Sequence, residues 1–362
     1  MIPYVIPAMC LKPIERISPS RYVSLEACFL REVWAANEQV SLLLPRPPAA
    51  HLGIVIHKIL ELTVKGIIKG DEAIYDCWNE EIAMIEKNMK GNWLEEHLAP
   101  LSKTAPNYEV KRQMCFLRVK TLLYHRSRGL FRSDKGMQSE VPVKTSDGTV
   151  YGKIDAVQFH RDGVEIIDYK TGAITDVLYG DDSVKLAYEK QMKLYAGLFH
   201  SEYGTWPAKM TIIGLNGEVY NIRLEIDECL NIVEDAKRQL NRVNKLILNR
   251  EPPDHLARAS PNACKYCSFR PACSVYWKER QNTLEWPSDF CGAIKAKQTL
   301  GNGLVRIMLG DGKIDIIVRG LLPSRHKFLL EEAKRVMFCD MRRDNSPGHF
   351  TEGYRTTGYI VQ

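Results

Sequence analysis

Two acidic residues and a lysine stand where a β-hairpin would bring them together. Asp155 lies in a run of β-branched residues, and Asp168 and Lys170 end the next such run, with the turn-forming residues 160–163 between them. A hairpin loop of two or four residues sets Asp155 opposite Asp168, and a tighter turn sets it opposite Lys170. Both registers leave the three side chains on one face of the sheet, whereas a three-residue loop would separate them.

Such a trio suits metal-assisted hydrolysis. Two carboxylates with Cβ atoms about 5 Å apart repel each other, so their juxtaposition favours a cation between them, and Mg²⁺ or Mn²⁺ prefers oxygen ligands. Next to that ion and a phosphate, Lys170 could orient a water and stabilise developing negative charge. The alternative is that Asp168 and Lys170 only mark the end of a strand before the Thr171-Gly172 turn.

Further polar candidates lie outside the hairpin. His57 occurs in an apolar helical run, where it is either a ligand or a hydrogen-bonded core histidine. Gln191 and Tyr195 are four residues apart, so they share one helix face and either reach a substrate or support packing. Glu140 precedes the hairpin.

The elements that must position these residues follow from periodicity. The first third of the chain is helical, including a helix that starts at Ser18 and runs through Trp34 with Cys28 on it. Period-two patterns then predict strands at 140–143, 150–157, 164–170 and 210–213, with helices at 183–201 and up to residue 249. This order predicts an α/β layer arrangement with helices on a central mixed sheet.

In this order the residues resemble the RecB-type branch of the PD-(D/E)XK nuclease superfamily. The pattern comprises Gly-x-x-x-His (Gly53, His57), Glu140, Gly-x-x-Asp (Gly152, Asp155), Asp-x-Lys-Thr-Gly (Asp168 to Gly172) and Gln-x-x-x-Tyr (Gln191, Tyr195). The resemblance implies a restriction-endonuclease-like α/β core with helical insertions over residues 1–285, and hydrolysis of phosphodiester bonds in DNA.

The resemblance also implies a role for each residue. His57, Asp155, Asp168 and the backbone carbonyl of Tyr169 would bind Mg²⁺ or Mn²⁺, and Lys170 would activate the attacking water. Glu140 joins the catalytic group, while Gln191 and Tyr195 would contact DNA. We expect single-stranded or end-containing DNA as substrate, in repair, recombination or phage defence. A catalytically silent scaffold partnering a helicase, or an RNA-directed nuclease, is the alternative.

Three cysteines form a second motif. Cys264, Cys267 and Cys273 give the spacing C-x2-C-x5-C, three soft ligands where a tetrahedral site needs four. Iron-sulfur members of the same nuclease branch carry one early cysteine after a Ser-Pro-Ser start, and Cys28 occupies the matching place, followed by Phe29 where Pro is usual. The resemblance therefore implies a 4Fe-4S cluster that staples the nuclease domain, with zinc as the alternative metal.

After Trp286-Pro287 the pattern changes, which predicts a domain boundary and a C-terminal domain over 286–362 that can be removed from a folded nuclease. Strands at 292–297, 304–309 and 314–318, a helix at 324–334 and two further strands follow the order of an OB-fold barrel. Its aromatic residues, Phe338, Phe350, Tyr354 and Tyr359, could stack on bases or form the core.

Composition and charge set the broad class. With 45% hydrophobic and 26% charged residues, the 362-residue chain is globular, and a net charge of +6 permits a polyanionic partner. A basic segment at 111–135 is either a solvated helix face or a surface that tracks phosphates. Neither a signal peptide nor a run of eighteen apolar residues occurs, so we expect a cytoplasmic protein without membrane contact. In that compartment we expect its ten cysteines to form no disulfide framework.

Overall fold

The computed structural model describes residues 4–128, 136–175, 184–330 and 334–361. Helices of the N-terminal three quarters of the chain surround a mixed five-stranded sheet in the order β1-β2-β3-β4-β5, in which β3–β4 is the parallel pair among the described strands. Its strands are β1 (Met137–Lys144), β2 (Tyr151–His160), β3 (Gly163–Lys170), β4 (Lys209–Gly214) and β5 (Val219–Ile222). The predicted central mixed sheet is confirmed, with β5 as an additional short strand.

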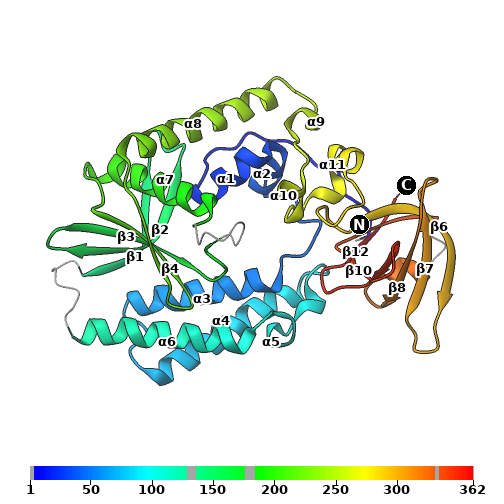
Figure 1. Cartoon of the computed structure of the whole chain (residues 1–362), viewed down its shortest axis with the longest axis horizontal. Coiled ribbons are helices and arrows are strands. Elements are labelled where there is room, and N and C mark those ends of the chain that lie inside the picture. The colour runs from blue at the N-terminus through cyan, green and yellow to red at the C-terminus, as the bar shows by residue number, and fades with distance from the viewer. Residues whose placement is uncertain (1–3, 129–135, 176–183, 331–333, 362) are drawn as a thin grey trace.

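Helices cover both faces of this sheet (Figure 1). One core contains residues of α1 (Pro19–Ala27), α2 (Phe29–Ala36), α7 (Leu186–Tyr203) and α8 (Ile226–Leu248). The other contains residues of α3 (Pro48–Val64), α4 (Asp71–Lys90), α5 (Leu101–Thr104) and α6 (Tyr108–Ser127). Helices α3 and α7, which carry His57 and Gln191, both contact β1 and β2 and therefore pack directly on the sheet.

Close packing of α7 on α8 fixes the position of α7. The buried residues of α8 recur every three or four positions, from Cys229 to Ile247, and form one apolar stripe. Gly197 of α7 lies so close to this stripe that an added Cβ would stand 2.6 Å from Cγ2 of Val233 and 2.8 Å from the Cys229 carbonyl oxygen. A glycine is therefore what lets the two helices approach.

The C-terminal segment forms a second sheet, of seven strands, in the order β10-β11-β8-β7-β6-β9-β12. The pair β8–β11 is parallel and the other pairs among the described strands are antiparallel, while Val5 adds a single parallel bridge to Ile360 of β12. Between β8 and β9 lies a short 3-10 turn, η3 (Lys327–Leu330), whose Phe328 and Leu329 are buried in the core. The strands are β6 (Phe290–Thr299), β7 (Val305–Gly310), β8 (Asp315–Leu321), β9 (Arg335–Cys339), β10 (Arg342–Arg343), β11 (His349–Thr351) and β12 (Thr357–Ile360).

The structure corrects one expectation for this segment and decides between two alternatives for its aromatic residues. The helix predicted over 324–334 is only the turn η3 in its described part; residues 331–333 lie outside the described ranges. Of the four aromatic residues, Phe338, Phe350 and Tyr359 are buried, so they pack the protein interior and cannot stack on bases. Tyr354 is 63% exposed.

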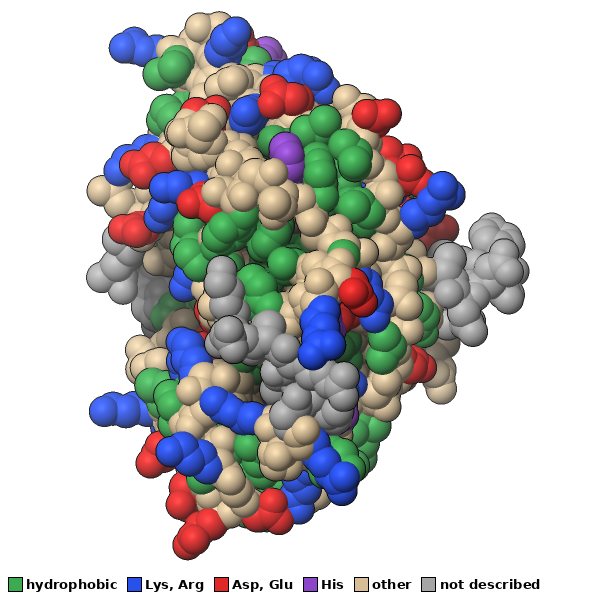
Figure 2. Space-filling model, turned by 90° about the vertical axis from the view of Figure 1, so that its left-hand side faces the viewer, with side chains coloured by type: hydrophobic (Ala, Val, Ile, Leu, Met, Phe, Trp, Pro, Cys, Tyr) green, Lys and Arg blue, Asp and Glu red, His purple; other side chains and the backbone are tan. Residues whose placement is uncertain are grey.

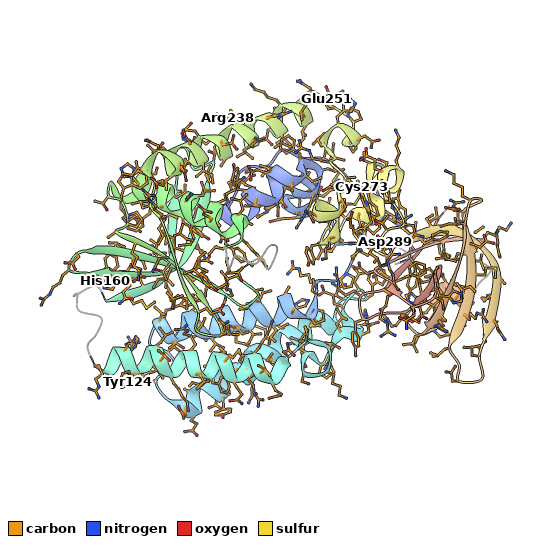
Figure 3. The ribbon with its side chains drawn as sticks, in the orientation of Figure 1. Tyr124, His160, Arg238, Glu251, Cys273 and Asp289 are labelled. Carbon is orange, nitrogen blue, oxygen red and sulfur yellow. The ribbon has the colours of Figure 1, made fainter. Side chains whose placement is uncertain are left out.

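Short helices connect the two sheets: α9 (Pro253–Leu256), α10 (Pro261–Lys265), η2 (Arg270–Ala272) and α11 (Ser274–Glu279). Arg270 is fully buried and crosses the boundary predicted at residue 286. Its guanidinium donates to both carboxylate oxygens of Asp289, at 2.6 and 3.3 Å, to Asp340, and to the Cys267 carbonyl at 3.1 Å. Figure 3 labels Asp289 and Cys273 near this junction.

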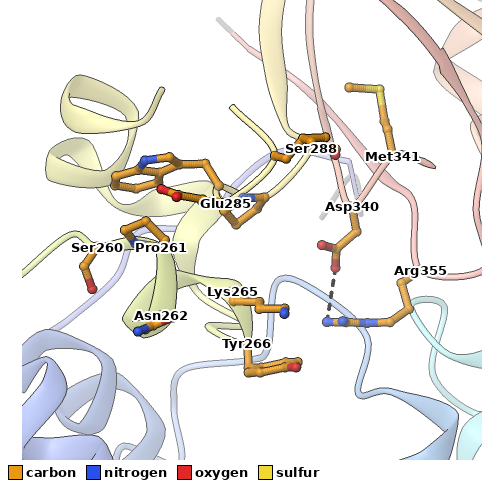
Figure 4. Close-up of a pocket in the computed structure, with 13 residues that line it drawn as sticks. Ser260, Pro261, Asn262, Lys265, Tyr266, Glu285, Ser288, Asp340, Met341 and Arg355 are labelled. Carbon is orange, nitrogen blue, oxygen red and sulfur yellow. Dashed lines mark ion pairs between the residues drawn. The ribbon is translucent and has the colours of Figure 1, made fainter. Parts of the chain in front are cut away.

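A groove of about 780 Å³ opens beside the Arg270 network. Lys265 and Tyr266 line it from the α10 side, and Asp340 and Arg355 line it from the C-terminal sheet. Figure 4 shows the ion pair between Asp340 and Arg355, with 3.1 Å between the carboxylate and the guanidinium. The two halves of the molecule thus meet through buried charges as well as through apolar contacts such as those of Leu43 and Tyr359.

The described part of the basic segment lies on α6 and its C-cap Arg128, and its basic side chains are mostly paired. Lys120 binds Asp71 at 2.7 Å and Arg112 binds Glu109 at 2.7 Å, while Arg126 donates to the Thr63 carbonyl. Arg132 lies outside the described residues. On the face seen in Figure 2, Lys and Arg side chains are interspersed with Asp and Glu. This geometry favours a solvated helix face over a continuous phosphate-tracking surface.

Within the part of the chain that the structure describes, none of the helices combines the length and apolar character that a bilayer span requires.

Candidate active site

The β2–β3 hairpin places the two acidic residues opposite each other. Its pairs run from Ala156 with Ile167 to His160 with Gly163, which leaves a loop of two residues. One step further along the same register, Asp155 faces Asp168 across the strands. The two-residue alternative for the hairpin loop is therefore confirmed.

A third carboxylate lies on the same rung of the sheet. In the β1–β2 ladder, Ser139 pairs with Ala156 and Val141 with Ile154, so Glu140 stands opposite Asp155. The row Glu140, Asp155 and Asp168 crosses three adjacent strands. Burial and the neighbouring Asp155 raise the pKa of Glu140 above its usual value, as expected for carboxylates that repel one another.

Asp168 is the most buried member of the row, with its side chain only 3% exposed. Burial, opposed by Lys170 and reinforced by Asp155, raises the pKa of Asp168 to about 6. Its Oδ1 accepts a hydrogen bond from Gln191 at 3.1 Å. Its Oδ2 lies 2.6 Å from the Lys170 ammonium and forms an ion pair with it. The charge of this buried carboxylate is therefore offset by a lysine of the same strand.

Lys170 and Gln191 complete a triangle with Asp168. The Lys170 ammonium donates to Oε1 of Gln191 at 2.9 Å, and the amide of Gln191 donates in turn to Asp168. Gln191 comes from α7, which the chain traverses between the parallel strands β3 and β4. The crossover thus brings a helix face onto the carboxyl end of β3, where Lys170 stands.

His57 reaches the row from α3. Its Nδ1 lies 3.3 Å from Oδ2 of Asp155, and the same carboxylate oxygen accepts the Tyr169 amide at 2.8 Å. Burial lowers the pKa of His57. The hydrogen bond to Asp155 and the negative charges of Asp155 and Asp168 together raise this pKa by more, so the net shift is upward. The imidazole therefore stands directly against the acidic row.

Glycines of the sequence motifs permit close approaches here. A Cβ on Gly53 would stand 3.1 Å from Oγ1 of Thr171, and one on Gly152 would stand 2.7 Å from Cδ of Pro19. Gly53 therefore allows α3 to lie against the turn after Lys170. Gly152 allows the start of α1 to reach β2.

One acidic residue at this site was missed by the sequence analysis. Glu61 lies one turn after His57 on α3 and lines a pocket of about 460 Å³ together with His57, Glu140 and Thr171. Ion pairs to Lys58 at 3.0 Å and to Lys65 hold its carboxylate. The spacing of four residues from His57 was the available signal, because it puts both side chains on one helix face.

Gln191 and Tyr195, expected to contact DNA, are both buried. Gln191 uses its amide on Lys170 and Asp168, while the Tyr195 ring lies against Gly152. The geometry favours a role in holding Lys170, Asp168 and the strand β2 in place.

The four cysteines converge although 236 residues separate Cys28 from Cys264. All four line one small pocket, together with Arg31, Arg258 and Arg270 among others. The sequence analysis predicted one helix through Cys28, and this prediction is wrong. Cys28 is an extended residue (φ −163°, ψ 114°) between α1 and α2. The chain therefore turns at Cys28 even with Phe29 in place of the usual proline.

Burial dominates the chemistry of these thiols. It raises the pKa of Cys267 to about 11 and that of Cys273 to about 12, with smaller increases from the neighbouring cysteines. Without a cation the Cys267 and Cys273 thiols are therefore protonated near neutral pH. Among the described residues, no three His, Cys, Asp or Glu side chains are arranged to hold a metal ion as they stand.

Comparison with solved structures finds 15 similar chains, and two of them illustrate how distant the likeness is. A candidate exonuclease from Eubacterium rectale is 14% identical, with 74% of this chain and 90% of that chain covered and a TM-score of 0.42. A protein from Vibrio cholerae is 15% identical, covers 65% of this chain and 57% of its own, and has a TM-score of 0.19. At these scores neither carries a functional argument. No curated protein matches the sequence.

The decisive comparison is with protein families. The family model of the PD-(D/E)XK nuclease superfamily matches residues 16–274. These residues include the acidic row, Lys170, α7 and the four cysteines. This match covers well over half of the chain and the whole of the central sheet with its helices. The chain therefore belongs to the PD-(D/E)XK nuclease superfamily.

Proposed function

We propose that this nuclease hydrolyses phosphodiester bonds of DNA with the help of Mg²⁺ or Mn²⁺. The observation that carries the proposal is the row of Glu140, Asp155 and Asp168 on one rung of the sheet, with Lys170 beside it. Three carboxylates so close together, one of them buried, are costly for a fold unless a cation or a proton offsets their charge.

The chemical types of the donor groups suit a hard divalent ion, although no three of the described side chains are arranged to hold one as they stand. His57, Asp155, Asp168 and the Tyr169 carbonyl would hold it, and the contact of His57 with Asp155 at 3.3 Å supports this assignment because it brings the imidazole against the acidic row. When bound, the ion would activate a water and neutralise charge on the phosphate. Lys170 would hold the attacking water and stabilise developing negative charge, while Gln191 keeps Lys170 and Asp168 in register.

We propose that Cys28, Cys264, Cys267 and Cys273 bind a 4Fe-4S cluster, with zinc as the alternative. Their convergence on one pocket, which contains Arg31, Arg258 and Arg270, supports the proposal because cations favour the thiolate form that such ligands require. The role would be structural, since the cluster would join α1 and α2 to the segment before the C-terminal sheet.

For the C-terminal segment we propose a domain over 286–362 with an OB-like barrel. The pairing of β6 with both β7 and β9, and the parallel pair β8–β11, support that topology, although β12 adds a strand. We expect single-stranded or end-containing DNA as substrate, in repair, recombination or phage defence in the cytoplasm. The sequence contains no Gly-x-x-x-x-Gly-Lys-Ser/Thr motif, so unwinding would require a helicase or defence-system partner.

The test is cleavage of end-labelled single-stranded DNA, double-stranded DNA and RNA by anaerobically purified protein with Mn²⁺. Asp168→Asn and Lys170→Ala should each abolish cleavage while DNA binding survives. Asp162→Asn, an exposed acid in the loop of the same hairpin, is the matched control and should keep wild-type activity. Undiminished cleavage by either site variant would refute the assignment. RNA cleavage alone would favour the RNA-directed alternative, and binding without any cleavage would favour the silent scaffold.

A further inference from the structure

Lys170 has one neighbour that the nuclease motif does not account for. Its ammonium lies 4.5 Å from the centre of the Tyr188 ring, in addition to its contacts with Asp168 and Gln191. We propose that Tyr188 is a positioning residue that holds Lys170 through the face of its ring. This inference rests on the proposed function, because it assigns a role relative to the catalytic lysine.

The position of Tyr188 follows from α7. Tyr188 and Gln191 are three residues apart, so they lie on the same helix face, and both meet the Lys170 side chain from α7. The ring is partly buried and packs against the main core of the nuclease region. It is therefore a rigid surface, whereas the lysine carries four flexible methylenes.

The electrostatics suit an aromatic neighbour better than a further acid. Lys170 is 15% exposed, so its ammonium has lost much of its water, and a ring face compensates for part of that loss. A carboxylate in place of the ring would add negative charge and compete with Asp155 and Asp168 for the divalent ion. A neutral ring fixes the ammonium without adding negative charge to the acidic row.

A second lysine shares the ring. The Lys185 ammonium lies 5.8 Å from the ring centre and donates to the Ala173 carbonyl at 2.9 Å. Its longer distance and its backbone acceptor make it the weaker partner of Tyr188. Lys185→Met therefore offers a control that removes one cation from the ring and leaves the Lys170 contact in place.

The experiment replaces Tyr188 with Phe, with mono-, di- and trifluorinated phenylalanine, and with Leu. Fluorine weakens the negative face of the ring while leaving its shape nearly unchanged, so a packing role would not respond to it. With Mn²⁺ and labelled single-stranded DNA, we expect kcat of the Phe variant to stay within twofold of wild type and to fall stepwise as fluorines are added. The Leu variant should lose about tenfold in kcat at unchanged KM, because a partly desolvated cation–π contact is worth about that factor. Tyr124→Leu, which loses the 5.2 Å contact with Arg128 on α6, should have no effect.

A second readout does not depend on activity. The rate at which an acylating reagent modifies Lys170, measured by peptide mass spectrometry, should rise several-fold in Tyr188→Leu and stay unchanged in Tyr188→Phe and Lys185→Met. Equal kcat and equal Lys170 labelling for Leu and Phe would overturn the inference and reduce Tyr188 to a packing residue. Wild-type protein that cleaves no nucleic acid would refute the proposed function instead, and the labelling experiment would still decide whether Tyr188 holds Lys170.

Discussion

Replacing Arg270 by Met should strongly destabilise the protein, although Arg270 lies outside the acidic row. The guanidinium is fully buried and serves Asp289, Asp340 and the Cys267 carbonyl. Removing it leaves the carboxylate of Asp289, which is also fully buried, without its cation. Breaking a buried pair from one side costs about 3–5 kcal/mol. At about 2 °C per kcal/mol for a large chain, the melting temperature should fall by about 8 °C.

Thermal and urea unfolding followed by circular dichroism measure the effect. The double variant Arg270→Met/Asp289→Leu should recover part of the lost stability, because no uncompensated charge then remains at Asp289. Arg223→Met is the control, since Arg223 is 87% exposed in its pair with Glu225 and should change the unfolding free energy by under about 0.5 kcal/mol. A loss below about 1 kcal/mol for Arg270→Met, or no recovery in the double variant, would refute the reasoning.

The remaining predictions concern other parts of the chain. Cys28→Ala should lose brown absorption, iron and thermal stability, whereas Cys77→Ala, which changes a cysteine outside the four-cysteine pocket, should lose none of them; full iron retention in Cys28→Ala would remove Cys28 from the site. Gly197→Ala should cost about 1–3 kcal/mol in urea unfolding because α7 and α8 must separate, and unchanged stability would contradict that close approach. Burial lowers the pKa of His326 below its usual 6.5, so the unfolded chain gains the proton first as the pH falls. The free energy of unfolding should therefore decrease as the pH drops below about 6.5. His326→Gln should flatten that decrease in unfolding experiments, and an identical pH profile would contradict this account.

The Arg270 network also changes what is expected from truncation. The sequence break at Trp286-Pro287 predicts a C-terminal domain that can be removed, but deletion from residue 288 onward would take away both Asp289 and Asp340. We therefore expect the truncated nuclease to unfold at lower temperature than the whole chain. Equal melting temperatures would restore the original expectation of independent folding.

Sequence alone determined the features that depend on local spacing. Side-chain alternation along a strand meant that any even-numbered hairpin loop would set Asp155, Asp168 and Lys170 on one face, and the structure supplied the two-residue loop. The order of strands and helices predicted the mixed sheet, and the C-x2-C-x5-C spacing identified the late cysteines. The mixed sheet is confirmed, and the grouping of the late cysteines could be seen because it rests on residues within one short segment.

Tertiary structure alone decided which distant segments meet. The row of three acids needed the β1–β2 register for Glu140, and Glu61 and Tyr188 joined the site only through the packing of α3 and α7. Local periodicity likewise did not show that Phe338, Phe350 and Tyr359 point inward, or that Arg270 spans the predicted boundary. Burial depends on which surface covers a residue, and that surface comes from chain tens to hundreds of residues away, beyond the reach of any local pattern.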